Sequence, residues 1–178
     1  MINTCIGFAL GLSAAYWGGW WDDFVNGLTN MMLAIPSLVF ALAIMAILSP
    51  GLTSPLIALG LTNWSFTCRL TRAATLSVKQ LGYVEAARSL GYGTFRIMLT
   101  QILPNIAGPI IVIGTLGMGG AVLAEASLSF LGLGIRPPFP SWARCSPTRA
   151  IFLTVLGLNR LGDGLRDILD PHSQLRKA

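Results

Sequence analysis

Few side chains in this sequence have the type and spacing that chemistry on a substrate requires. The single histidine, His172, has no ligand or triad companions. Cys5, Cys68 and Cys145 lack the paired spacing of a zinc or redox site, and we interpret them as small apolar side chains. No carboxylate pair, no Ser/His/Asp set and no Gly-x-x-x-x-Gly-Lys-Ser/Thr phosphate loop is visible. We therefore predict that the chain is not an enzyme and binds no metal or cofactor of its own.

The segment around Glu85 has instead the composition of a docking element. Residues 83–90 can form about two helical turns, with a narrow face made of Leu81, Val84, Ala87 and either Arg88 or Gly91. Glu85 lies early in this helix, where a negative charge is favourable, and Gly91 stands where a helix would stop. So short a helix is marginal in water, so we expect it to pack against other elements. Ala86 and Ala87 leave room for a partner to approach, whereas the simpler alternative is an ordinary turn between two spans.

The elements that position this segment are predicted to be membrane helices. The sequence has 53% hydrophobic and 11% charged residues and a mean hydropathy of +0.68. Soluble domains carry roughly 25% charged residues. Backbone amides cannot stay unpaired in lipid, and the apolar runs are too long for barrel strands, so the spans should be helices. The predicted fold class is an all-α integral membrane protein, a polytopic bundle of transmembrane helices.

The apolar runs predict the spans and their breaks. We expect helices at about 4–15, 24–48, 56–75 and 106–126, and a shorter one from about 150 to 158. Pro36 should kink the second helix. At 1.5 Å per residue the last run covers about half of a hydrocarbon core that is roughly 30 Å thick. Residues 162–178 mix acids with Arg and Lys and are predicted to be a solvated tail.

The distribution of basic residues predicts the orientation. Arg69 is the first basic residue, and counting from it there are five basic residues up to Arg96 against the single acid Glu85. Most of these residues form a basic loop at 72–96. Positively charged short loops stay in the cytoplasm, so residues 17–23, this loop and the tail should be cytoplasmic. Residues 49–55 and 128–149 should then lie outside, although three arginines in the second of these segments count against it. Orientation also explains the net charge of +5 better than nucleic-acid binding does.

Polar residues inside the apolar runs have two interpretations. They either pack between helices or line a path for a solute, and in the third run they are Asn63, Ser65, Thr67 and Thr71. Glu125 near the end of the fourth run is too costly to face lipid, so it should face protein, water or the far interface. The small residues Gly114, Gly117, Gly119 and Gly120 predict close helix approach.

Several blocks together carry a family resemblance. Glu85-Ala86-Ala87, three residues, Gly91 and then Ile102-Leu103-Pro104 resembles the EAA signature of permease subunits of bacterial ABC importers. The wider set resembles the second permease subunit of the dipeptide, oligopeptide and nickel branch. The matching blocks run nearly end to end, at residues 16–20, 33–37, 83–88, 103–105, 125–134 and 161–167.

This resemblance implies a single transmembrane permease domain over residues 1–178, of the type I ABC importer kind. It also implies that the first family span is missing, that the last is shortened, and that residues 76–96 form a cytoplasmic coupling loop. Glu85, Ala86, Ala87 and Gly91 are assigned to contact with an ATPase, with Val84, Leu90 and Tyr92 as neighbours. The implied partners are a second permease, two ATP-binding subunits that hold ATP and magnesium, an extracytoplasmic solute-binding protein and the lipid bilayer. The implied location is the bacterial cytoplasmic (inner) membrane.

The predicted function is import of dipeptides and oligopeptides driven by partner ATPases, with nickel or another solute left open. Gln101 replaces a histidine that members of the family often have before Ile-Leu-Pro. Between Trp142 and Ala150, this chain has about two dozen residues fewer than members of the family have. A shortened, non-transporting membrane remnant is therefore the alternative. A stand-alone channel or secondary carrier would need ionisable residues in its spans, and Glu125 alone fits this loosely.

Overall fold

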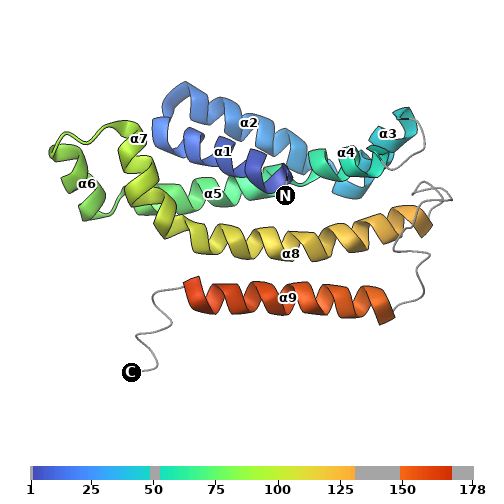
Figure 1. The fold of residues 1–178 in the computed structure, drawn as a ribbon. Helices are drawn as coiled ribbons and strands as arrows, with labels where there is room; N and C mark the ends of the chain where they lie inside the picture. The colour runs from blue at the N-terminus through green and yellow to red at the C-terminus, as the bar shows by residue number, and fades with distance from the viewer. Residues whose placement is uncertain (1, 49–52, 131–148, 170–178) are drawn as a thin grey trace.

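The computed structural model describes residues 2–48, 53–130 and 149–169, and these ranges contain helices and no strand. Most of the longer helices lie side by side, and the short helices α6 and α7 project at one end (Figure 1). The all-α prediction is confirmed for the described ranges. The elements are α1 (Ile2–Trp17), α2 (Gly19–Ala34), α3 (Ser37–Ile47), α4 (Thr53–Thr62), α5 (Trp64–Lys79), α6 (Gly82–Ser89), α7 (Thr94–Ile97), the π-helical turn η1 (Met98–Ile102), α8 (Leu103–Phe130) and α9 (Arg149–Leu169).

The longest helix is the clearest membrane span. Elements α7, η1 and α8 join into one helix, of which Thr94–Ser129, 36 residues, is long and apolar enough to cross a bilayer. The pair α2 and α3 meets the same criterion if the two are counted as one bent span. The described residues thus contain one or two spans by length and composition.

The helix around Pro36 is broken rather than kinked. We expected one helix over residues 24–48, but α2 and α3 meet at an angle of 86°. Ile35 (φ −93°, ψ 125°) and Pro36 (φ −55°, ψ 126°) are both extended. A proline pushes the residue before it out of the helical region and offers no N–H of its own. The prediction of a single kinked helix was therefore wrong.

The predicted helix over residues 56–75 is also two helices, because the chain breaks at Asn63 between α4 and α5. The Leu59 carbonyl near this break accepts hydrogen bonds from Asn3 Nδ2 at 2.8 Å and from Thr62 Oγ1 at 3.3 Å. Such donors are needed where a helix is interrupted in an apolar environment. Helix α5 then continues to Lys79, so the first part of the predicted basic loop at 72–96 is helical.

The last helix is longer than its apolar run suggested. Helix α9 continues to Leu169 and has 21 residues, about 32 Å, so the predicted end near 158 was wrong. The first part of the predicted tail from 162 is helical, with Asp163 and Gly164 exposed as a solvated segment would be. Gly162 is buried against α8, where an added Cβ would lie 2.6 Å from Thr115 Oγ1. The exposed Arg160 belongs to the polar side of an amphipathic helix and does not end it. The predictions for residues 131–148 and 170–178 lie outside the described residues.

Helices α1 and α5 pack in parallel through glycines. A Cβ added at Gly7 would lie 2.7 Å from Thr67 Cβ, and one added at Gly11 would lie 2.9 Å from Thr71 Cβ. These two glycines, four residues apart, let the helix backbones approach closely, as small-xxx-small pairs do in membranes. In α8, Gly114 faces Thr4 and Gly119 faces Asn159, whereas Gly117 and Gly120 meet open space. The predicted role of the α8 glycines is thus confirmed for two of the four.

The ends of the helices group as the charge pattern predicted. The corner between α1 and α2, helix α6 and the C-terminal end of α9 lie at one end of the molecule, and α3 lies at the other (Figure 1). Contacts along the chain agree, because Lys79 near the start of α6 donates to the Ala15 and Tyr16 carbonyls at the end of α1. We call the end that carries α6 the α6 end.

Candidate partner-docking site

Helix α6 forms where the sequence predicted a two-turn helix, and its ends have clear causes. Leu81 is extended (φ −77°, ψ 140°), and its carbonyl accepts the first helical bond from the Val84 N–H at 2.9 Å. Gly91 adopts φ +79°, which glycine tolerates best. The Gly91 N–H donates to Arg88 O at 3.0 Å and the Tyr92 N–H to Ala87 O at 3.2 Å. This pair of bonds is a Schellman ending, so the predicted stop at Gly91 is confirmed.

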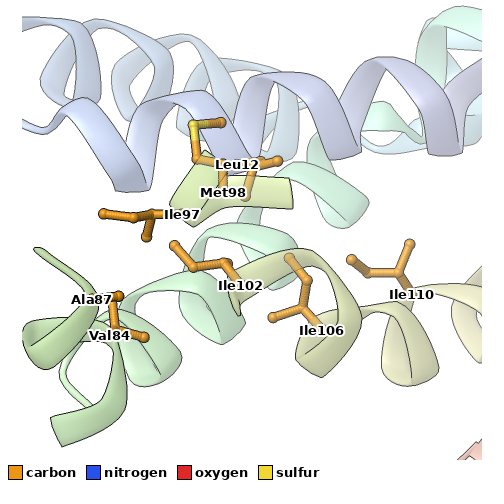
Figure 2. Packing of buried hydrophobic residues seen from close by; sticks show 8 residues of the cluster. All are labelled: Leu12, Val84, Ala87, Ile97, Met98, Ile102, Ile106 and Ile110. Carbon is orange, nitrogen blue, oxygen red and sulfur yellow. The ribbon is translucent and has the colours of Figure 1, made fainter. Parts of the chain in front are cut away.

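One face of α6 is seated in the core of the chain. Val84 is 0% exposed, and Ala87 is buried beside it. Figure 2 shows the two side chains next to each other at one edge of the buried cluster, near Ile97 and Ile102. They belong to one cluster, here called the α6 cluster, with Leu12, Ile97, Met98, Ile102, Ile106 and Ile110. The expected packing of this short helix is confirmed, because burial of this face offsets its weak intrinsic stability.

The opposite face of α6 is open. Glu85, Ala86 and Gly91 are exposed, and Leu90 keeps 74% of its surface exposed. We call these four residues the docking surface. Of the seven residues assigned to the partner from the sequence, Val84 and Ala87 are covered by the chain's own side chains. Tyr92 is half-buried at the edge of the α6 cluster, with the Arg96 guanidinium 4.4 Å from its ring centroid.

Sequence reasoning missed Tyr83, an exposed aromatic residue in the first turn of α6. The helical spacing did not signal this exposure, because Tyr83 lies four residues before the buried Ala87 and so near the same side of the helix. Two charged side chains of α6, Glu85 and Arg88, are also exposed. Within the described ranges, the Glu85 carboxylate and the Arg88 guanidinium, both exposed, have no ion-pair partner. The open face can therefore offer a carboxylate, small side chains and an apolar side chain to another protein.

Comparison with known proteins identifies the family. Residues 7–174 match the family described as binding-protein-dependent transport system inner membrane component. The chain belongs to this family. The predicted kinship with importer permeases is thereby confirmed.

Similar members of this family are named as permeases of transport systems rather than as enzymes. The glutathione transport system permease protein GsiD of Pectobacterium atrosepticum is 39% identical over 96% of this chain and 62% of its own length. The dipeptide transport system permease protein DppC of Alkalihalophilus pseudofirmus is 41% identical over 93% of this chain and 60% of its own length. GsiD of Escherichia coli O6:K15:H31 is 41% identical over 96% of this chain and 61% of its own length. The chain thus spans about three fifths of the length of these relatives.

Helix α6 packs on α5 and α7, and its cluster reaches into an irregular helical turn. Ile97, Met98 and Ile102 of the α6 cluster lie in or beside η1. Pro104 follows η1 and has no N–H to donate to the Thr100 carbonyl, so the wider π-helical turn accommodates the missing bond. Through this cluster, the buried face of α6 is packed against the start of the longest helix.

The buried polar residues of the chain mostly pack between helices. Ser65, Thr67 and Thr71 are buried along α5, which favours interhelical packing over a solute path for these three, while Asn63 is exposed at the helix break. Glu125 is 8% exposed, and its Oε1 accepts a hydrogen bond from Ser129 Oγ at 2.7 Å, so of the three surroundings considered for it, protein is the one observed. Among the described residues, no group of three or more His, Cys, Asp or Glu side chains could hold a metal ion.

Proposed function

We propose that this chain is a transmembrane permease subunit of an ATP-binding-cassette importer that moves peptides across the bacterial cytoplasmic (inner) membrane. Membership of the inner-membrane component family supports the class. The peptide substrate is supported by the names of the relatives, which are glutathione and dipeptide permeases. The observation that carries the proposal is helix α6, seated by Val84 and Ala87 and open at its docking surface.

The docking surface is proposed to contact an ATP-binding subunit. Leu90 places most of an apolar side chain outside the chain's own packing, and covering that surface is favourable at about 25 cal/mol per Å². Glu85 adds an unpaired charge that a basic residue of the ATPase would meet. The ATPases supply the ATP and magnesium sites, while a second permease and an extracytoplasmic binding protein complete the importer.

The proposed orientation places the α6 end in the cytoplasm and makes the chain multi-pass. Basic residues concentrate near this end on α5, α6 and α7, as the positive-inside tendency requires. Trp17 and Trp20 at the α1–α2 corner are exposed, which suits the headgroup layer. Helix α8 crosses the bilayer, and α1, α5 and the bent pair α2–α3 complete the bundle with it.

Co-purification tests the docking proposal. The chain is expressed with a partner permease and a tagged ATPase of a related peptide importer, and retention on the ATPase is measured. Wild type should be retained, and Glu85→Lys and Gly91→Trp should each lose retention. Asp163→Lys, which reverses an exposed acid on α9, is the matched control and should be retained. Retention of both α6 variants would overturn the docking surface. Failure of wild type to assemble would favour the non-transporting alternative.

Substrate class is tested separately with the assembled complex in proteoliposomes. Uptake of labelled glutathione, a dipeptide, a longer peptide and a nickel chelate is compared with matched binding proteins present. We expect ATP-dependent uptake of at least one peptide. Uptake of the nickel chelate alone would replace the peptide assignment while leaving the importer class intact.

A further inference from the structure

Two cations on α5 bind the corner between α1 and α2, one at the residues before the corner and the other at a residue after it. The first is Arg72, whose Nε and Nη2 each donate to one carboxylate oxygen of Asp22 at 2.6 Å. This two-point geometry fixes direction as well as distance. Both side chains are partly shielded, with Asp22 16% and Arg72 28% exposed, so water weakens the pair less than at an open surface.

The second cation is Lys79, the last residue of α5. Its Nζ donates to Ala15 O at 3.0 Å and to Tyr16 O at 2.7 Å, and it lies 5.5 Å from the Tyr16 ring centroid. These carbonyls belong to the last turn of α1, where backbone acceptors lack helical partners and a positive charge is favoured. Lys79 therefore caps the end of α1.

The corner that these cations hold is itself tightly turned. Gly18 and Gly19 adopt φ +67° and +57° between α1 and α2. Lys79 binds the chain just before these glycines, and Arg72 binds Asp22 just after them. Both contacts come from one face of α5, so the corner is tied to α5 at two points.

The same end of α5 leads directly into the docking helix. Two residues, Gln80 and Leu81, separate Lys79 from the first residue of α6, and the Leu81 N–H donates to Val78 O at 3.1 Å. Tyr16 and Val78 also pack against the α6 cluster. A displacement of α6 therefore reaches the end of α5 first and the tied corner next.

We propose that Asp22, Arg72 and Lys79 are positioning residues for transport, forming a clamp that makes the α1–α2 corner move with α5 when α6 is displaced. This proposal rests on the proposed function, because the displacement comes from the ATPase. The proposal gives none of the three residues a contact with the solute. Their role is to carry the movement from α6 to α1 and α2.

A first experiment tests the clamp without transport. Spin labels are placed at the exposed positions Trp20 and Ser77 in an otherwise cysteine-free full chain in lipid nanodiscs, and the distance distribution is measured. Asp22→Asn and Arg72→Lys, which keeps the charge but loses the two-point geometry, should broaden the distribution. Asp23→Asn and Arg69→Gln change neighbouring exposed charges and should leave it narrow. An unchanged distribution in both clamp variants overturns the clamp, whether or not the complex transports.

A second experiment tests its role in the assembled importer. Peptide uptake per ATP hydrolysed should fall roughly 5- to 150-fold in Asp22→Asn, the usual range of coupling between sites, while ATP hydrolysis stays within about twofold. The swap Asp22→Arg with Arg72→Asp should recover part of the loss. Unchanged uptake per ATP in an assembled Asp22→Asn complex overturns the coupling role. Absence of uptake by wild type would instead count against the proposed function, and the label distances would still decide the clamp.

Discussion

Gly11 in α1 lies so close to Cys68 in α5 that a Cβ atom added at Gly11 would overlap the Cys68 carbonyl oxygen and lie 2.9 Å from Thr71 Cβ. Gly7 has the same relation to the Trp64 carbonyl one turn earlier. The two contacts bring α1 alongside α5. They thereby place the last turn of α1 within reach of Lys79. The clamp and the seat of α6 both depend on this close approach.

Gly11→Ala should destabilise the chain by about 1–3 kcal/mol, because backbone atoms of α5 would have to move to admit the methyl group. Gly27→Ala is the matched control, since Gly27 lies in α2 with open space around it. The control should stabilise the helix by up to about 1 kcal/mol through helix propensity. Reversible unfolding in mixed detergent micelles measures both changes. Equal effects of the two substitutions would count against the packing described for α1 and α5.

Ile102→Ala should cost about 2–5 kcal/mol, because Ile102 is fully buried in the α6 cluster and its loss leaves a cavity. Leu99 lies in the same π-helical turn but is 58% exposed, so Leu99→Ala should change the unfolding free energy by less than about 0.5 kcal/mol. The same unfolding assay compares them. A larger effect at Leu99 than at Ile102 would mean that α6 is seated differently.

Gly91→Ala should weaken the end of α6 by about 1–2 kcal/mol, since a non-glycine residue is strained at φ +79°. Gly91→Asn should cost less, because asparagine tolerates this conformation better. Gly93→Ala serves as the control, because Gly93 has φ −64° and open space around it. Hydrogen exchange of the α6 amides reports the change. Faster exchange in Gly93→Ala than in Gly91→Ala would refute the glycine-dependent ending.

Gly162→Ala should loosen α9 from α8, because the new methyl group would lie 2.6 Å from Thr115 Oγ1. Thr115→Ala removes that oxygen, so the double variant should recover part of the stability that Gly162→Ala loses. Gly157→Ala, at an open position of α9, should have little effect. A double-mutant cycle on the unfolding free energy measures the recovery. Strict additivity of the two changes would contradict the contact.

The local features of α6 were predictable because its signals lie within a few residues of each other. Gly91 sets the stop, Glu85 lies in the first turn, and Val84 and Ala87 share a face. The division between partner-facing and buried residues was harder. In a helix of two turns, one residue separates a covered position from an open one. The positions of α5 and α7, which contact α6, decide which face is covered.

The larger errors came from elements whose limits depend on distant contacts. The break at Asn63 is supported by Asn3, a residue in another helix, through the Leu59 carbonyl. Helix α9 continues past Leu158, and Gly162 in its extension packs on Thr115, a contact that an apolar run cannot reveal. The break at Pro36 was signalled locally, but the resulting angle of 86° is set by how α3 packs on α4.

Accessibility of the docking surface tests the central claim most directly. A single cysteine at Leu90, in an otherwise cysteine-free chain, is treated with a membrane-impermeant maleimide applied from the cytoplasmic side, with and without the ATPase. We predict rapid labelling in the absence of the ATPase and at least roughly tenfold slower labelling when it is bound, as a burial of about 1.4 kcal/mol or more would produce. A cysteine at 90 that stays unlabelled without the ATPase, or that labels equally fast in the assembled complex, would contradict the account.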